Sequence, residues 1–342
     1  MSLAHGVRYF CVPRPGVGLT LREGAVPEPG DGQVLVRMRA WSLNFRDLLI
    51  AEGRYPRPVK PDVVALSDGA GEIERLGPGV TRWSAGDRVI GTYFPRWLSG
   101  TGKPERTAYD LGGAVDGVLA EYVVFGEDAL VAVPAQLDFA EAATLPSAGV
   151  TAWRAVVEEG RVKPGDDVLT MGSGGLSTFA LQFAVLGGAR VIATSGSDGK
   201  HERLRALGAA DVINHVRTPG WGTAAAGLTP GGVDHVVDVG GAGTLAQSLL
   251  AARVGGRISI AGVLKHGGGV DPLLILAKQL TLRGLTNASR ETFERMNRAV
   301  EQHGLHPVID RRFGFDDISA AYAYLATGAH VGKVVIVADG RG

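Results

Sequence analysis

The stretch VLTMGSGGLSTFALQFAVLGGARVIATSGSDGK, residues 168–200, decides the fold that this chain is expected to adopt. An apolar run ends in a cluster of glycines, a pattern with helical period follows, and a second apolar run ends at Ser195. A strand, a glycine turn, a helix and a second strand in this order are typical of a dinucleotide-binding unit in a parallel sheet.

The glycine turn has the residues that such a unit needs beside a pyrophosphate. Gly172 would let the chain turn tightly off the strand, and Gly174 would let the pyrophosphate approach the backbone, while Ser177 stands where a third glycine is usual. The following helix has an apolar face, and its N-terminus can hold an anion. We therefore predict that the turn contacts the cofactor through Gly172, Ser173, Gly174, Gly175 and Leu176.

Ser195 ends the second strand, where an NAD-binding unit usually has an Asp or Glu that binds the ribose hydroxyls. A carboxylate there would repel a 2′-phosphate, and a serine does not. Ser197 and Lys200 follow in the same loop and add a hydroxyl donor and a positive charge, which a phosphate needs. The sequence thus predicts NADPH as the cofactor. The alternative is that Ser197 caps a helix and that Lys200 is a solvated charge.

The composition narrows the classes of function. The chain has 342 residues, 35 basic and 35 acidic side chains, and a single cysteine, Cys11. Balanced charge argues against a nucleic-acid or membrane partner, and one cysteine excludes a metal site built from several thiolates. No apolar run approaches the length of about 18 residues that a membrane span needs. We expect a soluble cytoplasmic protein that binds a small molecule.

The chain divides into segments of different character. Residues 1–146 contain short extended runs separated by turn signals, which indicates antiparallel β structure. Residues 147–286 contain six apolar strand candidates that alternate with helices, the full number of a doubly wound parallel sheet. Residues 287–342 hold two helical patterns and a closing strand. We expect an α/β protein with a Rossmann domain over 147–286 and a mainly β domain to which the last segment returns.

Several stretches together carry a family resemblance. They are the glycine turn, SLNFRDLL (42–49), SDGAGEIERLGPGVTRWSAGDRV (67–89), LPSAGVTAW (145–153) and RMNRAVEQHGLHPVID (295–310). With them the chain resembles the medium-chain dehydrogenase/reductases, in particular the zinc-free quinone oxidoreductase and enoyl reductase branch, whose members are often named zinc-type alcohol dehydrogenase-like. The resemblance implies a split GroES-like catalytic domain, a Rossmann domain and an active site in the cleft between them. It also suggests a homodimer, for which the edge strand at LTLRGLT could pair across a two-fold axis.

The resemblance also locates a metal position. Zinc-dependent relatives hold the metal with two cysteines and a histidine, and the matching positions in this chain are Asn44, Ser67 and Ser147. Amide and hydroxyl oxygens are poor zinc ligands, and the eight histidines form no HxH or HxxxH pair. We expect no metal site, and hydride transfer to an electrophile that is reactive by itself: a quinone or an α,β-unsaturated carbonyl.

Two side chains of the first segment are candidate catalytic residues. Asn44 would orient the nicotinamide ribose or the substrate oxygen, or it satisfies a buried turn. Tyr55 would donate a proton or bind the oxyanion, or it has a structural role. Arg46 and Asp47 could pair with each other and hold the loop. Two aromatic residues, expected either to line the substrate pocket or to pack in the core, are Tyr93 and Trp97.

Further cofactor contacts are expected where the strands of an open α/β sheet end. The ends of the fourth and fifth strands should border the nicotinamide half of the cofactor. Thr151 is placed there by the resemblance, although it could instead pack a helix, and Lys333 is either a cation over the cofactor or a surface lysine. The strand-end candidates are Val239, Gly240, Gly262 and Val263.

These features predict a zinc-independent, NADPH-dependent oxidoreductase that acts on a quinone or an α,β-unsaturated carbonyl. Two alternatives stay open. A zinc-free alcohol or ketone dehydrogenase would reduce a carbonyl without a conjugated double bond. A non-catalytic NADPH-binding protein would bind the cofactor without turnover.

Overall fold

The computed structural model describes residues 6–14, 16–262 and 269–338. Val263, one of the expected cofactor contacts, lies outside the described residues. The chain divides into two compact units: Met1–Val150 with Asn287–Gly342, and Thr151–Thr286. The expected boundary after residue 146 falls four residues before this division.

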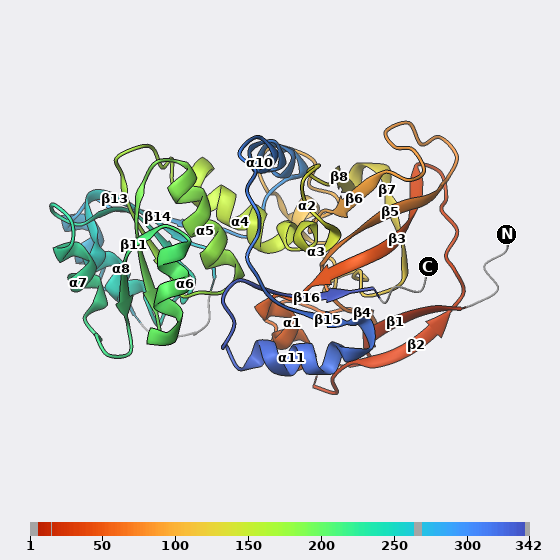
Figure 1. Ribbon diagram of the computed structural model, residues 1–342, viewed down its shortest axis with the longest axis horizontal. Helices are drawn as coiled ribbons and strands as arrows, with labels where there is room; N and C mark the ends of the chain where they lie inside the picture. Colours follow the sequence, from red (N-terminus) through yellow and green to blue (C-terminus); the bar gives the residue numbers. More distant parts are fainter. Residues whose placement is uncertain (1–5, 15, 263–268, 339–342) are drawn as a thin grey trace. The chain divides into compact units, whose positions relative to one another are not determined.

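The first unit is built mainly of β-strands (Figure 1). A seven-stranded sheet has the order β15-β16-β3-β5-β6-β8, with β7 also paired to β3, and a three-stranded sheet has the order β2-β1-β4. The strands are β1 Val7–Val12, β2 Thr20–Gly24, β3 Gln33–Ser42, β4 Val63–Val64, β5 Asp68–Leu76, β6 Arg88–Gly91, β7 Tyr122–Gly126, β8 Leu130–Ala132, β15 Ile309–Gly314 and β16 Lys333–Val337. The helices are α1 Phe45–Ala51, α2 Pro104–Thr107, η1 Glu127–Ala129, α3 Phe139–Ala142, η2 Leu145–Gly149, α10 Arg290–Gln302, η5 Phe315–Asp317 and α11 Ile318–Ala326.

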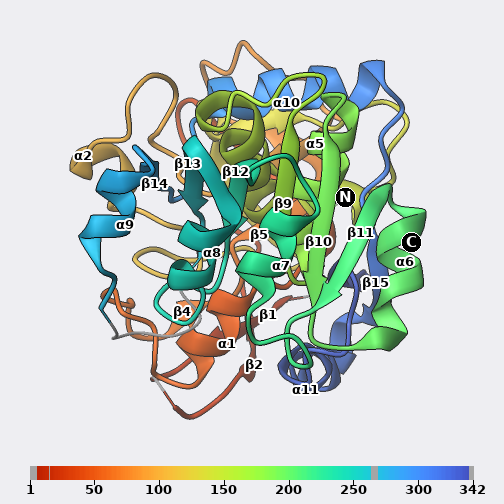
Figure 2. The same cartoon turned by 90° about the vertical axis from the view of Figure 1, so that its left-hand side faces the viewer.

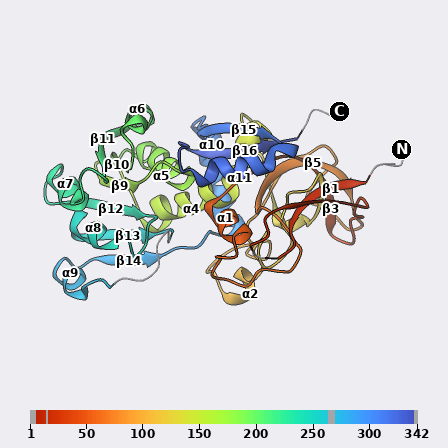
Figure 3. The ribbon, with the colours of Figure 1, turned by 90° about the horizontal axis from the view of Figure 1, so that it is seen from below.

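The C-terminal segment is part of this first unit. Strand β16 pairs antiparallel with β3, with Ile336 opposite Trp41. The ring of Phe315 lies 5.0 Å from that of Trp41 and 5.3 Å from that of Phe10, between ring centroids. Figure 3 shows α11, β15 and β16 beside the strands of the first half of the chain. Residues from both ends of the sequence therefore form one hydrophobic core.

The second unit is a six-stranded parallel sheet with the order β11-β10-β9-β12-β13-β14 (Figure 2). Numbered from its first strand, this is the 3-2-1-4-5-6 order of doubly wound dinucleotide-binding sheets. The strands are β9 Asp167–Met171, β10 Arg190–Ser195, β11 Ala209–Asn214, β12 Val233–Asp238, β13 Ala252–Ile260 and β14 Thr281–Gly284. The helices are α4 Val150–Trp153, η3 Arg154–Glu159, α5 Gly175–Leu186, η4 Asp198–Lys200, α6 His201–Ala206, α7 Trp221–Gly227, α8 Leu245–Ala251 and α9 Pro272–Ala277.

The two faces of this parallel sheet are covered by different helices. Leu169 of β9 belongs to a buried cluster with Trp221 of α7 and Leu249 of α8. Helix α5 contributes Phe179 and Phe183, whose rings stack on each other. The predicted α/β fold is confirmed: a doubly wound parallel sheet accompanies a mainly β domain. Among the described residues, no helix has the length and apolar character needed to cross a membrane.

Candidate active site

The glycine turn has the backbone form that its sequence predicts. Gly172 follows β9 with φ +78°, in the left-handed region that glycine adopts readily. Gly174 is the N-cap of α5, and Gly175 is its first residue. The hydroxyl of Ser177 donates a hydrogen bond to the carbonyl of Met171. The serine that replaces the third glycine therefore ties the helix back to the end of β9.

The loop after β10 is joined to the glycine turn by a lysine. The ammonium of Lys200 lies 3.1 Å from Oγ of Ser173 and donates to it, so Lys200 is not an isolated solvated charge. Ser195 is buried, and its hydroxyl donates to the carbonyl of Ser197 at 3.0 Å and accepts from the amide of Ser197 at 3.2 Å. Ser197 precedes η4, but its side chain makes no capping hydrogen bond. Ser195 thus shapes this loop without adding negative charge.

The structure adds a basic residue that the sequence argument missed. Arg217 lies 3.0 Å from Asp198, between Nη2 and Oδ1, and Asp198 also accepts from Asn214 at 2.7 Å. Arg217 therefore stands next to the loop that carries Lys200. Because β10 and β11 pair in parallel, the loops that follow them lie at the same edge of the sheet, and this adjacency is the signal that could have indicated Arg217.

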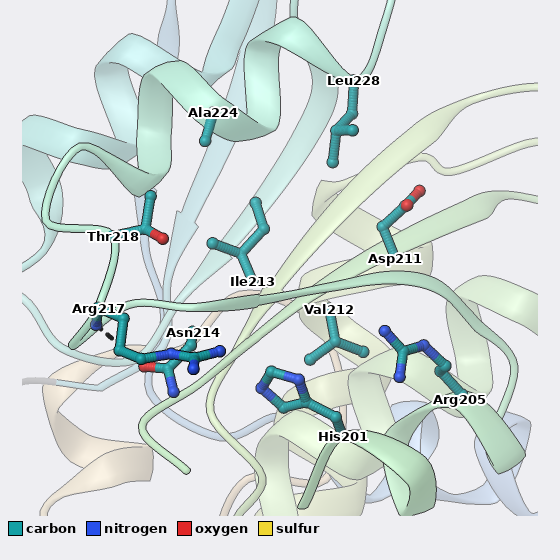
Figure 4. Close-up of a pocket in the computed structure, with 10 residues that line it drawn as sticks. All are labelled: His201, Arg205, Asp211, Val212, Ile213, Asn214, Arg217, Thr218, Ala224 and Leu228. Atoms are coloured by element: carbon teal, nitrogen blue, oxygen red, sulfur yellow. Dashed lines mark hydrogen bonds between the residues drawn. The ribbon is translucent and has the colours of Figure 1, made fainter. Parts of the chain in front are cut away.

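A pocket of about 480 Å³ lies beside β11 (Figure 4). Helix α6 contributes basic and imidazole side chains to it, and α7 contributes apolar ones. The lining residues are His201, Arg205, Asp211, Val212, Ile213, Asn214, Arg217, Thr218, Ala224 and Leu228.

The strand-end candidates lie in loops that are held by a buried carboxylate. Asp238, the last residue of β12, is fully buried and accepts hydrogen bonds from the amides of Gly240 and Gly241 at 2.9 and 3.0 Å. Its two oxygens also accept from the hydroxyls of Thr244 and Ser248 at 2.6 Å each. Four donors therefore fix the loop that begins with Val239 and Gly240. Sequence reasoning named the loop and missed the carboxylate.

Gly262, which follows β13, and Thr151 of α4 each lie in tightly packed surroundings. A Cβ on Gly262 would lie 2.7 Å from the carbonyl oxygen of Val239, so the loops after β12 and β13 touch and only a glycine fits there. Thr151 is buried in α4, at 6 % exposure. The cofactor contacts of these residues stay predictions.

In the first unit, Asn44 and Lys333 are directly bonded. Asn44 is the N-cap of α1, and its Oδ1 accepts from the ammonium of Lys333 at 2.6 Å. Lys333 also donates to the carbonyl of Leu43 at 2.6 Å and is only 3 % exposed, so it is not a surface lysine. Burial lowers the pKa of Lys333, while the carboxyls of Asp68 and Asp47 oppose that shift.

Asp68 brings together the three positions, Asn44, Ser67 and Ser147, that the family resemblance matches to zinc ligands. Its Oδ1 accepts from the hydroxyl of Ser67 at 2.6 Å, and its Oδ2 accepts from the amide of Ser147 at 3.1 Å. Burial raises the pKa of Asp68, and Lys333 and the nearby amide of Asn44 oppose this shift. Nδ2 of Asn44 is buried and makes no hydrogen bond of normal geometry to a described residue.

This donor set does not fit zinc. It offers one carboxylate, one amide and two hydroxyls, whereas zinc takes thiolate, imidazole and carboxylate ligands. Over the described residues, no group of three or more His, Cys, Asp or Glu could hold a metal ion. The Lys333 ammonium already provides a positive charge beside Asp68.

Arg46 pairs with a residue that the sequence did not suggest. Its Nη2 lies 2.6 Å from Oδ2 of Asp110, while its Nη1 lies 3.8 Å from Asp47. Arg46 and Asp47 do form the expected ion pair, but the closer carboxylate is that of Asp110, from a loop 64 residues away. Tyr55 is half-buried, and its hydroxyl donates to Oδ2 of Asp110 over 3.4 Å.

The expected pocket walls pack on each other. Tyr93, Phe94 and Trp97 form a small buried cluster of their own. The rings of Tyr93 and Phe94 meet edge to face, with centroids 4.6 Å apart. Core packing is thus the role that the structure gives to Trp97, and Tyr93 combines it with contacts to Arg46.

A doubly wound sheet with a glycine turn, inserted into a split β domain, defines a two-domain dinucleotide-binding oxidoreductase. Two family descriptions match the chain: an alcohol dehydrogenase GroES-like domain over residues 30–135 and a zinc-binding dehydrogenase domain over residues 175–302. A zinc-type alcohol dehydrogenase-like protein of Schizosaccharomyces pombe is 43% identical, over 90% of this chain and 91% of that protein. The chain therefore belongs to the medium-chain dehydrogenase/reductase superfamily, among its zinc-type alcohol dehydrogenase-like members.

Other relatives differ in the activity that their names state. Quinone oxidoreductase of Homo sapiens is 26% identical over 98% of both chains. A solved Sinorhizobium meliloti protein described as an alcohol dehydrogenase has a TM-score of 0.93 and 40% identity, covering 98% of this chain and 99% of its own. The 2-octenoyl-CoA carboxylase reductase CinF, solved with NADP and 2-octenoyl-CoA, has a TM-score of 0.89 and 25% identity, covering 99% of this chain and 90% of its own.

Proposed function

We propose that this oxidoreductase is zinc-independent, uses NADPH, and reduces a quinone or an α,β-unsaturated carbonyl. The observation that carries the proposal is the donor set around Asp68. Asn44, Ser67 and Ser147, which the family resemblance matches to the zinc ligands, surround Asp68 and Lys333 and offer no thiolate or imidazole. Oxidation of a simple alcohol needs stabilisation of an alkoxide, for which this set has no Lewis acid. A conjugated acceptor is electrophilic without one.

The chemistry leaves a defined task to the side chains. When bound, NADPH would supply a hydride, which is two electrons and one proton, to the β-carbon of an enone or to a quinone ring. The product then carries a negative charge on oxygen and needs one proton from the protein or from water. Asn44 could orient the reacting groups, since Lys333 fixes its amide. Tyr55 is the candidate proton donor, because a phenol can donate a proton and its side chain is only partly buried.

The preference for NADPH rests on the loop after β10. Ser195 supplies no carboxylate there, and Lys200 extends toward the glycine turn, where it contacts Ser173. Arg217 adds a second positive charge next to the same loop. A phosphate on the adenosine ribose would gain from both charges. The relative CinF, which was solved with NADP, supports this assignment.

The relatives support the reaction class and also provide its rival. One is named a quinone oxidoreductase, and CinF was solved with an α,β-unsaturated thioester. Others are named alcohol dehydrogenases. A zinc-free alcohol or ketone dehydrogenase is therefore the second candidate function, and a substrate panel distinguishes the two.

We also propose a cytoplasmic homodimer. Strand β14 ends the order of the parallel sheet, so one of its sides has no partner strand among the described residues. Helix α9, just before β14, exposes Leu273 and Leu276 at 63 % and 74 %. A second copy would cover this apolar surface and pair the edge. Cys11 is buried and forms no disulfide, which is compatible with a reducing cytoplasm.

The experiment measures the oxidation of NADPH in the presence of three groups of substrate: quinones, enones, and ketones without a conjugated double bond. We expect turnover with the first two groups and none with the third. Turnover of ketones alone would support the alcohol dehydrogenase alternative. Tight NADPH binding with no turnover in any group would support a non-catalytic protein.

A further inference from the structure

Arg46 lies between two tyrosine rings. Its guanidinium carbon is 5.0 Å from the ring centroid of Tyr55 and 5.0 Å from that of Tyr93, although these tyrosines come from different loops. Tyr55 is also one of the groups that raise the pKa of Tyr93. One cation therefore contacts both phenol rings, and the two tyrosines influence each other.

Asp110 fixes this arginine from a third loop. The Arg46 side chain is 10% exposed and the Asp110 side chain 1%, and the two lie 2.6 Å apart between Nη2 and Oδ2. Nη1 of Arg46 also donates to the carbonyl of Leu111 at 2.8 Å. A Cβ on Gly113 would collide with both Asp110 and Arg46, so the backbone there is built around the pair. Such close packing restricts Arg46 to one position.

We propose that Arg46 and Asp110 are a positioning pair that holds the phenols of Tyr55 and Tyr93 together and sets how Tyr55 delivers its proton. This inference rests on the proposed function, in which Tyr55 is the proton donor. Tyr55 would give its hydroxyl proton to the reduced substrate and become a phenolate. Arg46 would stabilise that negative charge against the repulsion of Asp110, to which the Tyr55 hydroxyl donates over 3.4 Å in this structure. Tyr93 would donate a hydrogen bond to the phenolate, and water would return the proton.

The charges of the cluster suit these roles. Burial alone would lower the pKa of Arg46. Four neighbouring side chains raise it, so the guanidinium stays charged; they are Tyr93, Tyr55, Asp47 and Asp110. Burial raises the pKa of Tyr93 well above its ordinary value, against the effect of Arg46. Tyr93 therefore remains a neutral donor while Tyr55 reacts.

The test is a double-mutant cycle on Tyr55 and Asp110. Tyr55→Phe should lower kcat about 100-fold. Asp110→Asn and Arg46→Lys should each lower kcat about tenfold, with KM for NADPH changed less than about twofold. In the Tyr55→Phe background the same two substitutions should cost less than about twofold, because the group they position is gone. An equal loss in both backgrounds would overturn the proposal.

Arg57→Gln is the matched control. Arg57 contacts the other oxygen of Asp110 at 3.3 Å, and its side chain is 37% exposed. Its loss should change kcat less than about twofold. A loss as large as that of Arg46→Lys would show that any charge near Asp110 matters, and would also contradict a specific role for Arg46. If Asp110→Asn fails to fold, Arg46→Lys completes the cycle.

A measurement that needs no catalytic turnover distinguishes the failure of this proposal from the failure of the proposed function. In protein with ¹³C-labelled tyrosine, the resonances of Tyr55 and Tyr93 can be assigned from the two phenylalanine variants. Asp110→Asn should shift both resonances, and Arg57→Gln should leave them in place. If the wild-type chain reduces no quinone or enone but both resonances shift, the function is wrong and the positioning is right. Unshifted resonances would overturn the positioning.

Discussion

The ammonium of Lys333 lies 2.6 Å from Oδ1 of Asn44, and its charge acts on the buried carboxyl of Asp68. The family resemblance matches Asn44, Ser67 and Ser147 to the positions of zinc ligands, and in this chain an internal cation lies next to Asn44. A buried carboxylate requires a positive partner, because its desolvation is otherwise costly. Lys333 therefore compensates the charge of Asp68 electrostatically.

Replacing Lys333 by Met should destabilise the protein, by about 3 kcal/mol in the free energy of unfolding, because Asp68 would be left buried without its cation. The double variant Lys333→Met with Asp68→Asn should recover most of that loss, since no charge is then unpaired. Urea unfolding of both variants measures the difference. Purely additive losses would mean that the two residues do not compensate each other.

The purified protein should contain far less than one equivalent of zinc, and prolonged treatment with EDTA should leave its turnover of a quinone unchanged. The reason is the donor set: one carboxylate with amide and hydroxyl oxygens binds zinc poorly. Elemental analysis and the assay before and after chelation provide the measurement. One zinc per chain, together with loss of activity in EDTA, would contradict zinc independence.

Ser195→Asp should reverse the cofactor preference. The new carboxylate would repel the 2′-phosphate, and kcat/KM for NADPH should fall at least about tenfold, or 1.4 kcal/mol, while that for NADH should rise. Ser195→Ala is the control, because it removes the hydrogen bonds to Ser197 without adding charge and should affect both cofactors alike. A wild-type preference for NADH would contradict the assignment at the outset.

Leu276→Glu should convert a dimer to a monomer, which light scattering coupled to size-exclusion chromatography would detect. The side chain is 74% exposed on α9, and a buried carboxylate in a dimer interface would be unfavourable. Val216→Glu is the control, because Val216 is 66% exposed but follows β11 at the other edge of the sheet. A wild-type protein that is monomeric at micromolar concentration would contradict the dimer.

The sequence predicted the structural features that depend on residues close together in the chain. The glycine turn, the helix behind it and the alternating apolar runs were sufficient to predict the doubly wound parallel sheet of the second unit, because each of these patterns is local in the sequence. The partners of Arg46 and Asn44 were not predictable in this way. Asp110 and Lys333 lie 64 and 289 residues away in sequence, and their contacts exist only once separate loops have folded together.

Stability should fall as the pH decreases below about 6.5, because His235 is buried at 1% exposure in β12. Burial lowers its pKa from 6.5 to about 4, and nearby Arg257 adds to this effect. Above pH 6.5 the imidazole is neutral in both states and has no effect. Between pH 6.5 and 4 the unfolded chain binds a proton that the folded chain does not, so the free energy of unfolding decreases, by up to about 3 kcal/mol.

Thermal unfolding at pH 7.5 and 5 should show a smaller difference in stability for His235→Leu than for wild type, while the variant His303→Gln, at an exposed position, retains the full difference. Equal pH dependence in all three proteins would exclude His235 as its source.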